Sequence, residues 1–494
     1  MKHVKELKSH ADRVKEATEF VHTRDLSQAT YRLGYHLMAP SGWMNDPNGL
    51  IYFNNQYHAF YQHHPYDPTH GPMHWGHAIS DDLVHWNHLP IALAPGDRCD
   101  QSGCFSGSAV DDNGVLTLLY TGHNVINRER DTFYQNQNVA RSIDGIHFEK
   151  SSQNPVIPSQ PEGMQHHFRD PKVWKENGSW KMVVGSTEDE RGQVLLYQSD
   201  QLETWSYEGV LAKHNGGNEG YMWECPDFFP LGDEHVLLLS PQGIQTEGDR
   251  YQNHHQTGYF VGQYKKNQFE RGPFKELDYG HDFYAVQTFL DGKNRRIAIG
   301  WMDMWESPMP SQKEGWAGAF TLPRELLLKN GHLYMKPVDE LVALRETEIK
   351  LPSRNIANSW SLPLQGQKIE LVLAINLSQT NAKGFGLKLA QAEDGSEETV
   401  LFFNAETKTV TLDRSRAGEG VTGKRTAPIS WNDQLHIQLF LDRSSIEVFL
   451  NDGETVLTSR IYPRETSRGT ELFTFNGDVQ LEDSVGYVLK TVIA

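Results

Sequence analysis

Hydrophobic and polar residues alternate in short runs along most of this 494-residue chain. Between Tyr35 and about Leu344 the runs are interrupted at short intervals by Gly, Pro, Asn and Asp, and few of them have helical spacing. Short alternating runs that are separated by turn-forming residues are typical of antiparallel β-strands. The pattern therefore predicts an all-β region over residues 31–345.

The two ends of the chain have different patterns. Residues 1–21 carry apolar residues at helical spacing among many charged ones, which predicts an amphipathic helix within an N-terminal extension over residues 1–30. Residues 346–360 have the character of a linker, and alternating runs resume after it. Asn451-Asp452-Gly453 between two such runs is a hairpin signal. Residues 361–494 are therefore predicted to form a β-sandwich without a catalytic constellation.

A repeat runs through the all-β region. Similar turn segments that end in an aromatic residue begin at Ser80, Ser142 and Ser199. A second series recurs in step with them at an interval of about 60 residues, which is long enough for one blade of a β-propeller. Its members are Asp46, Ser106, Asp170, Glu224 and Val286. Five equivalent positions predict five blades, and their first strands would line the central channel.

Three carboxylates in this series, those of Asp46, Asp170 and Glu224, are thus expected to share one site. Glycosidic bond cleavage needs one carboxylate that attacks the anomeric carbon and one carboxylic acid that protonates the leaving oxygen, while a third can hold hydroxyl groups. Each motif alone is more typical of a turn or a strand end. Asn45 and nearby turn amides are expected to stabilise the charge of Asp46, and Arg169 is expected to keep Asp170 charged.

The motifs around these positions resemble glycoside hydrolase family 32, and within it the branch of bacterial invertases and sucrose-6-phosphate hydrolases. The likeness runs in order from about residue 30 to residue 494. Its main motifs are Trp43-Met44-Asn45-Asp46-Pro47-Asn48-Gly49, Phe60-Tyr61-Gln62, Trp75-Gly76-His77-Ala78, Phe105-Ser106-Gly107-Ser108, Phe168-Arg169-Asp170-Pro171-Lys172, Glu224-Cys225-Pro226-Asp227 and Asp282-Phe283-Tyr284-Ala285.

The resemblance implies an all-β fold, a five-bladed β-propeller followed by a β-sandwich, and a retaining β-fructofuranosidase acting on sucrose, sucrose 6-phosphate or both. By position, Asp46 would be the nucleophile, Glu224 the general acid/base and Asp170 the stabiliser of the transition state. Many relatives carry a Trp where this chain has His70, so the contact made by that Trp is in question. The residues implied to line the fructose site are Asn45, Gln62, Phe105, Ser106, Arg169 and Trp301, and Trp75 is expected to stack on a sugar face.

The balance of charge narrows the classes of partner. With 46 Lys and Arg against 64 Asp and Glu, the formal net charge is −18. Nucleic acids and anionic membranes bind basic surfaces, so neither is expected as a partner. No apolar run is long enough to span a bilayer, and residues 1–21 lack the unbroken apolar core of a secretory signal. The expected location is the cytoplasm.

Cysteine and histidine do not indicate a bound metal or another cofactor. Cys99, Cys104 and Cys225 are too few for a disulfide framework, although Cys99 and Cys104 could pair. The 23 histidines include three adjacent pairs, but adjacent residues of a strand point to opposite faces and lack the i, i+4 spacing of a helical zinc motif. We therefore expect no metal and no cofactor.

Three classes of function remain after this reasoning. The first is a hydrolase of sucrose or its 6-phosphate, and the second is an exo-acting fructanase or a fructosyltransferase with the same site. The third is a non-catalytic propeller that binds sugar, which the presence of all three carboxylates argues against. The lack of a secretory signal argues against a polymeric substrate. The sequence leaves open whether the chain is a monomer or a homodimer, and whether its substrate carries a phosphate.

Overall fold

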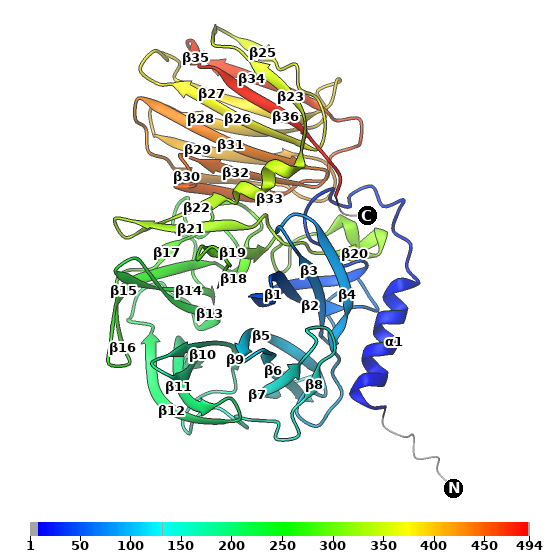
Figure 1. Cartoon of the computed structure of the whole chain (residues 1–494). Helices are drawn as coiled ribbons and strands as arrows, with labels where there is room; N and C mark the ends of the chain where they lie inside the picture. The colour runs from blue at the N-terminus through cyan, green and yellow to red at the C-terminus, as the bar shows by residue number, and fades with distance from the viewer. Residues whose placement is uncertain (1–7, 131, 493–494) are drawn as a thin grey trace.

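The structure, a computed structural model, describes residues 8–130 and 132–492, and nearly all of its regular structure is β-strand (Figure 1). A β-propeller, coloured blue to green, is followed by a β-sandwich, coloured yellow to red, that is stacked on one side of it. The all-β class and the order of the two domains predicted from the sequence are confirmed.

In the described residues before Arg345, the strands form five sheets. The first contains β20 (Trp316–Ala317), β1 (Gly42–Phe53), β2 (Gln56–His64), β3 (His74–Ser80) and β4 (Trp86–Leu93). The second contains β5 (Gly103–Asp112), β6 (Val115–Asn127), β7 (Thr132–Ser142) and β8 (Glu149–Lys150). The third contains β9 (Phe168–Glu176), β10 (Ser179–Glu188), β11 (Arg191–Gln201) and β12 (Thr204–Lys213). The fourth contains β13 (Met222–Leu231), β14 (Glu234–Gln242), β15 (Gly258–Lys265), β16 (Gln268–Arg271) and β17 (Lys275–Glu276). The fifth contains β18 (Tyr284–Leu290), β19 (Arg296–Trp301), β21 (Arg324–Lys329) and β22 (His332–Pro337).

The first strands of these sheets form a closed ring. β1 contacts β5 and β18, while β9 contacts β5 and β13, and β13 contacts β18. The ring is tied at its ends, because β1 pairs in parallel with β20 and the Gly42 N–H donates to the carbonyl of Gly315 (2.9 Å). Residues at the same height in all five strands therefore face a common axis.

Two sheets form the sandwich. One contains β23 (Arg345–Leu351), β36 (Ser484–Leu489), β26 (Ile369–Asn376), β31 (Gln434–Asp442), β32 (Ser445–Leu450), β33 (Thr455–Arg460), β24 (Arg354–Ile356) and β35 (Val479–Leu481). The other contains β25 (Ser359–Ser361), β34 (Gly469–Phe475), β27 (Gly384–Gln391), β28 (Glu398–Asn404), β29 (Thr409–Arg416) and β30 (Lys424–Pro428). Their inward-facing Leu, Ile, Val and Phe side chains form one buried core.

Residues 346–360, which the sequence pattern assigns to a linker, take part in the sandwich sheets. β23 pairs with β36, β24 with β35 and β25 with β34. β23 lies at the edge of its sheet and most of its side chains are at least partly exposed. An exposed edge strand needs few apolar residues, so only Ile349 and Leu351 mark it in the sequence.

Few helices accompany the sheets. α1 (His10–His22) lies against β4 on the outside of the propeller (Figure 1). It begins with a capping box in which Ser9 and Asp12 exchange hydrogen bonds, and its buried Ala17 packs near Ile91. The first seven residues of the predicted helix over 1–21 lie outside the described residues. Two short 3-10 helices, η1 (Pro310–Glu314) and η2 (Asp339–Leu344), lie between strands.

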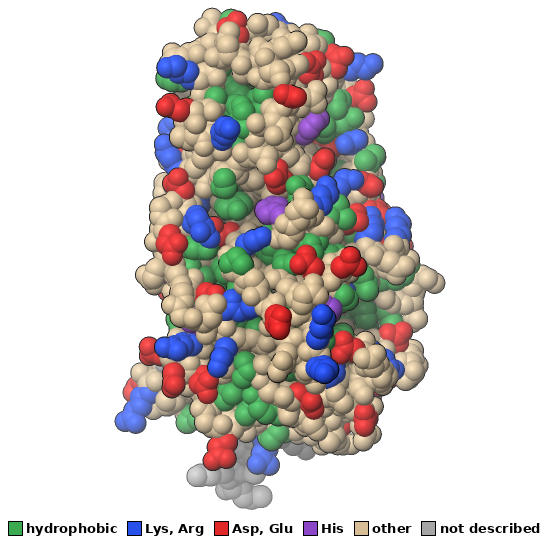
Figure 2. Space-filling view, turned by 90° about the vertical axis from the view of Figure 1, so that its left-hand side faces the viewer, with side chains coloured by type: hydrophobic (Ala, Val, Ile, Leu, Met, Phe, Trp, Pro, Cys, Tyr) green, Lys and Arg blue, Asp and Glu red, His purple; other side chains and the backbone are tan. Residues whose placement is uncertain are grey.

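The surface carries charges of both signs. On the face shown in Figure 2, acidic and basic side chains are interspersed, and neither sign gathers into a large patch. None of the helices formed by the described residues has the length and apolar character needed to cross a membrane.

Buried ion pairs join the propeller to the sandwich. Arg324 on β21 contacts Asp278 (3.0 Å) and Glu447 on β32 (2.6 Å). His36, in the segment before β1, lies between Asp442 (2.9 Å) and Glu447 (2.9 Å). Burial lowers the pKa of His36, but its hydrogen bonds with the two carboxylates outweigh this effect and raise the pKa from 6.5 to about 9. His36 is therefore positively charged at neutral pH.

We expect this histidine to make stability fall at alkaline pH. A histidine pKa that is raised by folding contributes stability that is fully present below 6.5 and is lost as the pH rises through about 9. The shift corresponds to about 3 kcal/mol of unfolding free energy. Urea unfolding between about pH 6 and about pH 10 should show this loss in the native protein and not in His36→Gln. The exposed His147→Gln is the control, and a His36→Gln curve parallel to the native one would contradict the prediction.

Candidate active site

The five positions that recur in the sequence lie at breaks in the pairing of the first strands. The register shifts fall at Met44/Pro47 in β1, Phe105/Gly107 in β5, Arg169/Lys172 in β9, Glu224/Asp227 in β13 and Tyr284/Gln287 in β18. A β-bulge bends the strand and changes the direction of its side chains. Asp170, Cys225 and Ala285 accordingly have φ angles of 67°, 49° and 54°, which few residues with a side chain adopt. The repeated bulge directs side chains from different sheets toward one another.

Asp46 is held by neighbours from two sheets. Its Oδ2 accepts a hydrogen bond from the Ser106 hydroxyl (2.6 Å), and its Oδ1 accepts one from Asn45 Nδ2 (2.9 Å). Asn45 Oδ1 in turn accepts a hydrogen bond from Trp43 Nε1 (2.7 Å). Asn45 and Ser106 are buried, while Asp46 is partly exposed. The carboxylate is therefore held in one orientation with a part left accessible.

Asp170 meets Asp46 around the thiol of Cys225. Cys225 Sγ lies 3.6 Å from Oδ2 of Asp46 and 3.6 Å from Oδ2 of Asp170. The Cys225 N–H also donates to Asp170 (2.9 Å), and the Asp170 N–H donates to the Thr121 hydroxyl (2.9 Å). Residues from β1, β6, β9 and β13 thus contribute to one hydrogen-bonded group.

Glu224 is bound by side chains from three sheets. Its Oε1 accepts a hydrogen bond from Arg169 Nε (2.9 Å), and the same guanidinium contacts it through a second nitrogen (2.9 Å). Its Oε2 accepts hydrogen bonds from Gln242 Nε2 (2.8 Å) and from the Tyr284 hydroxyl. Arg169 also donates to Nδ1 of His167 (2.7 Å). The side chain of Glu224 stays 15% exposed, so a reacting group can reach it.

Burial and crowding alter the acidity of the two aspartates. Burial raises the pKa of Asp46, and the nearby charge of Glu224 raises it further against the hydrogen bonds from Ser106 and Asn45. Burial also raises the pKa of Asp170, to about 7; Arg169 opposes this effect, and the charges of Glu224 and Asp46 add to it. Arg169 thus favours the charged form of Asp170, but burial and the two neighbouring carboxylates outweigh it, and its guanidinium donates a hydrogen bond to Glu224.

An aromatic group borders the carboxylates. Trp305 stacks on Trp43 with ring centroids 5.9 Å apart, and it meets Trp301 edge-on at 5.0 Å and His70 edge-on at 5.5 Å. Phe105 lies 6.3 Å from His70. His70 thus belongs to an aromatic border rather than to a polar one. Aromatic faces of this kind suit the apolar faces of a sugar.

The structure brings most of the predicted site residues together, namely Asp46, Asp170, Glu224, Asn45, Ser106, Arg169 and Phe105. The other three are fully or almost fully buried. Gln62 is 2% exposed and donates to the carbonyl of Cys104, and Trp75 is 0% exposed and donates to the carbonyl of Phe105. Trp301 is also 0% exposed. These three side chains present almost no free surface to a ligand.

Sequence reasoning missed three side chains of this group. Tyr284 lies inside a quoted motif and beside the predicted position Val286, but nothing marked its hydroxyl as a partner of Glu224. Gln242 ends β14 and pairs across from Met222, two residues before Glu224. The pairing of β13 with β14 could have indicated Gln242 as a neighbour of Glu224 once the hairpin was known. Trp305 lies in an irregular loop, and no sequence signal identified it.

Other candidate chemistry is not assembled in the described residues. Among residues 8–130 and 132–492, no group of three or more His, Cys, Asp and Glu side chains is placed to hold a metal ion. Cys99, Cys104 and Cys225 are all buried and free. The possible pairing of Cys99 with Cys104 is therefore not formed.

Comparison with known proteins gives matches over both domains. Residues 36–337 match the family profile "Glycosyl hydrolases family 32 N-terminal domain", and residues 340–487 match "Glycosyl hydrolases family 32 C terminal". The chain is 49% identical over 458 residues to the sucrose-6-phosphate hydrolase of Escherichia coli, and the aligned region covers 92% of this chain and 94% of that protein. It is 46% identical over 460 residues to the raffinose invertase of Escherichia coli, with 92% and 94% covered.

A solved structure has the same architecture. It is a mutant GH32 beta-fructofuranosidase of Bombyx mori in complex with sucrose, and it matches with a TM-score of 0.85 at 36% identity. The match covers 99% of this chain and 100% of that chain. It therefore extends through the propeller and the sandwich.

Proposed function

The chain belongs to glycosyl hydrolase family 32 and is a glycoside hydrolase, and from this premise we propose that it releases fructose from sucrose, sucrose 6-phosphate or both with retention of configuration. The supporting observation is the closeness of the three carboxylates: Asp46 and Asp170 both contact the thiol of Cys225, and the neighbouring Glu224 is near enough for its charge to raise the pKa of both aspartates. The names of the relatives and the sucrose in the Bombyx mori structure support the choice of substrate.

We assign the first chemical step to Asp46 and Glu224. An oxygen of Asp46 attacks C2 of the fructosyl unit while Glu224 gives its proton to the glycosidic oxygen. The bond between C2 and that oxygen breaks, glucose or glucose 6-phosphate leaves with the proton, and a fructosyl ester of Asp46 forms. Ser106 and Asn45 hold the carboxylate in place for the attack.

The second step reverses the role of Glu224. It takes a proton from a water molecule, whose oxygen attacks C2 and breaks the ester, so that fructose leaves and the Asp46 carboxylate is restored. Arg169, Gln242 and Tyr284 hold Glu224 during both steps, and Arg169 balances its negative charge after the proton has left.

The remaining residues bind the sugar or support the residues that do. Asp170 accepts hydrogen bonds from fructosyl hydroxyl groups, and these bonds strengthen as positive charge develops on the ring. Phe105 and Arg169 border the bound sugar directly. Gln62, Trp75 and Trp301 support the site from buried positions.

The proposed function also concerns the domain boundaries. We propose that each of the five sheets is one blade and that residues 31–345 form the catalytic propeller. A ring of five first strands with a bulge in each is the arrangement that supports this proposal. The bulges direct the three carboxylates toward the common axis.

The test of the proposed function is a comparison of substrates. We expect kcat/KM on sucrose or sucrose 6-phosphate to exceed kcat/KM per chain end of inulin by about 100-fold or more, because the named relatives act on sucrose-type substrates. The ratio between sucrose and its 6-phosphate identifies the preferred substrate. The Asp46→Asn variant, prepared in parallel, controls for contaminating enzyme. Comparable rates on inulin would favour a fructanase, and binding without turnover would favour a sugar-binding propeller.

A further inference from the structure

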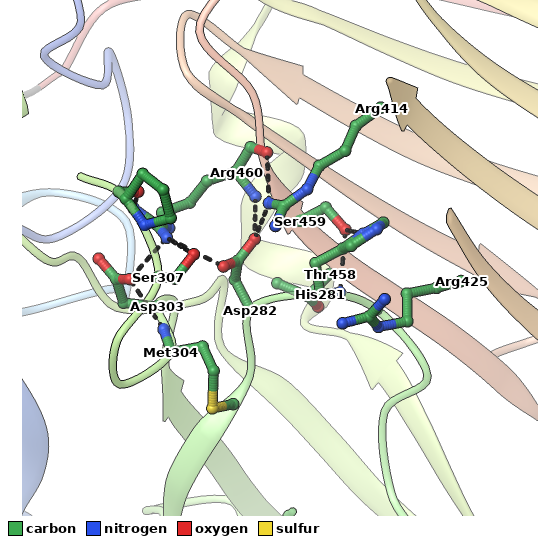
Figure 3. Close-up of polar contacts among 12 residues, drawn as sticks. His281, Asp282, Asp303, Met304, Ser307, Arg414, Arg425, Thr458, Ser459 and Arg460 are labelled. Carbon is green, nitrogen blue, oxygen red and sulfur yellow. Dashed lines mark hydrogen bonds and ion pairs between the residues drawn. The ribbon is translucent and has the colours of Figure 1, made fainter. Parts of the chain in front are cut away.

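A buried cluster of charges joins the sandwich to the propeller (Figure 3). Arg460, at the end of β33, is 5% exposed. One of its guanidinium nitrogens lies 3.1 Å from Asp282 and 2.8 Å from Asp303, both in the propeller. Arg414 on β29 also contacts Asp282 (2.6 Å). Among the described residues, Arg460 is the only cation that pairs with Asp303.

The two propeller aspartates flank the site end of neighbouring strands. Asp282 lies two residues before Tyr284 at the start of β18, and Asp303 lies two residues after Trp301 at the end of β19. Tyr284 and Trp301 face each other in the register of these strands. Arg460 of the sandwich therefore binds a residue just before β18 and a residue just after β19, at the end of this strand pair that reaches the site.

The first contact leads to Glu224. The Arg460 backbone N–H and the Arg414 guanidinium both donate to Oδ2 of Asp282 (2.8 and 2.6 Å). Two residues further on, the Tyr284 hydroxyl donates to Glu224. The position of Asp282 thus controls the start of β18 and with it the hydroxyl group that orients Glu224.

The second contact leads to the aromatic group. Arg460 also donates to the Ser307 hydroxyl (3.1 Å) and to the carbonyl of Pro308 (3.2 Å), and Asp303 accepts a hydrogen bond from the Met304 N–H (2.8 Å). The loop over residues 302–309 contains no helix or strand, and it carries Trp305. One guanidinium therefore holds this loop at three points around Trp305.

From Trp305 the contacts continue to Asp46. Trp305 stacks on Trp43 (5.9 Å), Trp43 donates to Asn45 (2.7 Å), and Asn45 donates to Asp46 (2.9 Å). Burial raises the pKa of Asp303 to about 7 against the effect of Arg460. Arg460 is thus the partner that balances the charge of this carboxylate when it is ionised.

We propose that Arg460 is a positioning residue for the reaction, through which the sandwich sets the Tyr284 contact to Glu224 and the place of the Trp305 loop. This inference rests on the proposed function. It gives the sandwich a part in the active site that its lack of catalytic groups does not suggest. The clamp consists of Arg460 with Asp282, Asp303, Ser307 and Pro308.

The test uses Arg460→Lys, which keeps the charge and loses the fork that binds several acceptors at once. We expect kcat/KM on the better of the two sucrose substrates to fall by about 10- to 100-fold, since small displacements of catalytic groups have effects of this size. KM should rise because the Trp305 loop shifts, and kcat should fall because the Tyr284 hydroxyl no longer orients Glu224. Asp442→Asn weakens a different buried contact between the domains, and none of the partners of Asp442 touches the site. It should lower the melting temperature and leave kcat and KM within about twofold.

Double-mutant cycles separate the two contacts. After Trp305→Ala, the Arg460→Lys change should raise KM by less than about twofold, and after Tyr284→Phe it should have little further effect on kcat. Additive effects in both cycles would overturn the proposal, as would an Arg460→Lys variant that loses thermal stability with unchanged kinetic constants. If Arg460→Lys does not fold, Ser307→Ala removes one acceptor only and should still raise KM measurably; an unchanged KM there counts against the loop contact.

A readout without substrate separates this proposal from the proposed function. Hydrogen exchange of peptides over residues 284–290 and 302–309 should be faster in Arg460→Lys than in the native protein and in Asp442→Asn. If the native protein hydrolyses neither sucrose nor its 6-phosphate, the proposed function fails, and the exchange data still test whether the clamp holds these segments. Exchange that is unchanged in both segments would overturn the clamp itself.

Discussion

Replacing Asp46 by alanine should lower kcat on sucrose by about 10⁵-fold. The nucleophile and the acid/base work together, so removing the nucleophile alone costs nearly as much as removing both. Neither step can proceed, since no fructosyl ester forms without this carboxylate. Initial rates with the better of sucrose and sucrose 6-phosphate measure the loss. Asp81→Ala, in an outer turn of the first sheet, is the matched control and should keep native kinetics.

Rescue of Asp46→Ala by azide would show that the missing group is the nucleophile. A small anion that enters the space left by Asp46→Ala can attack C2 from the same side, while Glu224 still protonates the leaving oxygen. The product is then a fructosyl azide of inverted, α configuration, formed in one displacement. Activity above about 1% of the native value without azide would contradict the assignment of Asp46 as nucleophile.

Replacing Glu224 by alanine should have a large effect that depends on the leaving group. Loss of a general acid costs about 10²- to 10⁴-fold where the leaving oxygen needs a proton. Turnover of sucrose should therefore collapse, while a fructoside with an activated leaving group should keep partial activity. Added azide should raise the rate on that substrate, because it attacks the fructosyl ester without a general base and gives a fructosyl azide of retained, β configuration.

The opposite configurations of the two azide products distinguish the two carboxylates. Glu234→Ala, at the far end of the β13–β14 hairpin, is the control and should behave as the native enzyme. If Glu224→Ala loses activity on sucrose and on activated substrates equally, and azide restores no activity, Glu224 is not the acid/base. Asp227 is then the next candidate, although it is fully buried and holds Lys172 and Thr288.

The sequence allows the all-β propeller and sandwich to be predicted because their units are local. Each propeller sheet folds mainly from one continuous stretch of chain, so its period of about 60 residues survives in the sequence. Positions that recur with this period meet at the axis, and Asp46, Asp170 and Glu224 do so. The edge strand β23 escaped prediction because an exposed strand has little apolar pattern.

The charge state of the site was harder to predict. The sequence suggested that Arg169 would keep Asp170 charged, but burial raises the pKa of Asp170 by more than Arg169 lowers it. Arg169 pairs with Glu224 from the next sheet. Trp75 shows the same limit, since its motif suggested a sugar contact and its position behind Phe105 buries it completely.

The sequence by itself determined the fold class and the order of the domains, because alternating runs and a repeat of about 60 residues are features of spacing along the chain, and that spacing also predicted Asp46, Asp170 and Glu224 as candidates for one site. The tertiary structure alone decided which side chains bind those carboxylates, how far burial raises the pKa of Asp170, and that Arg460 of the sandwich reaches Asp282 and Asp303. These features depend on distances between segments that are far apart in the chain, and only the packing of sheets and domains sets such distances.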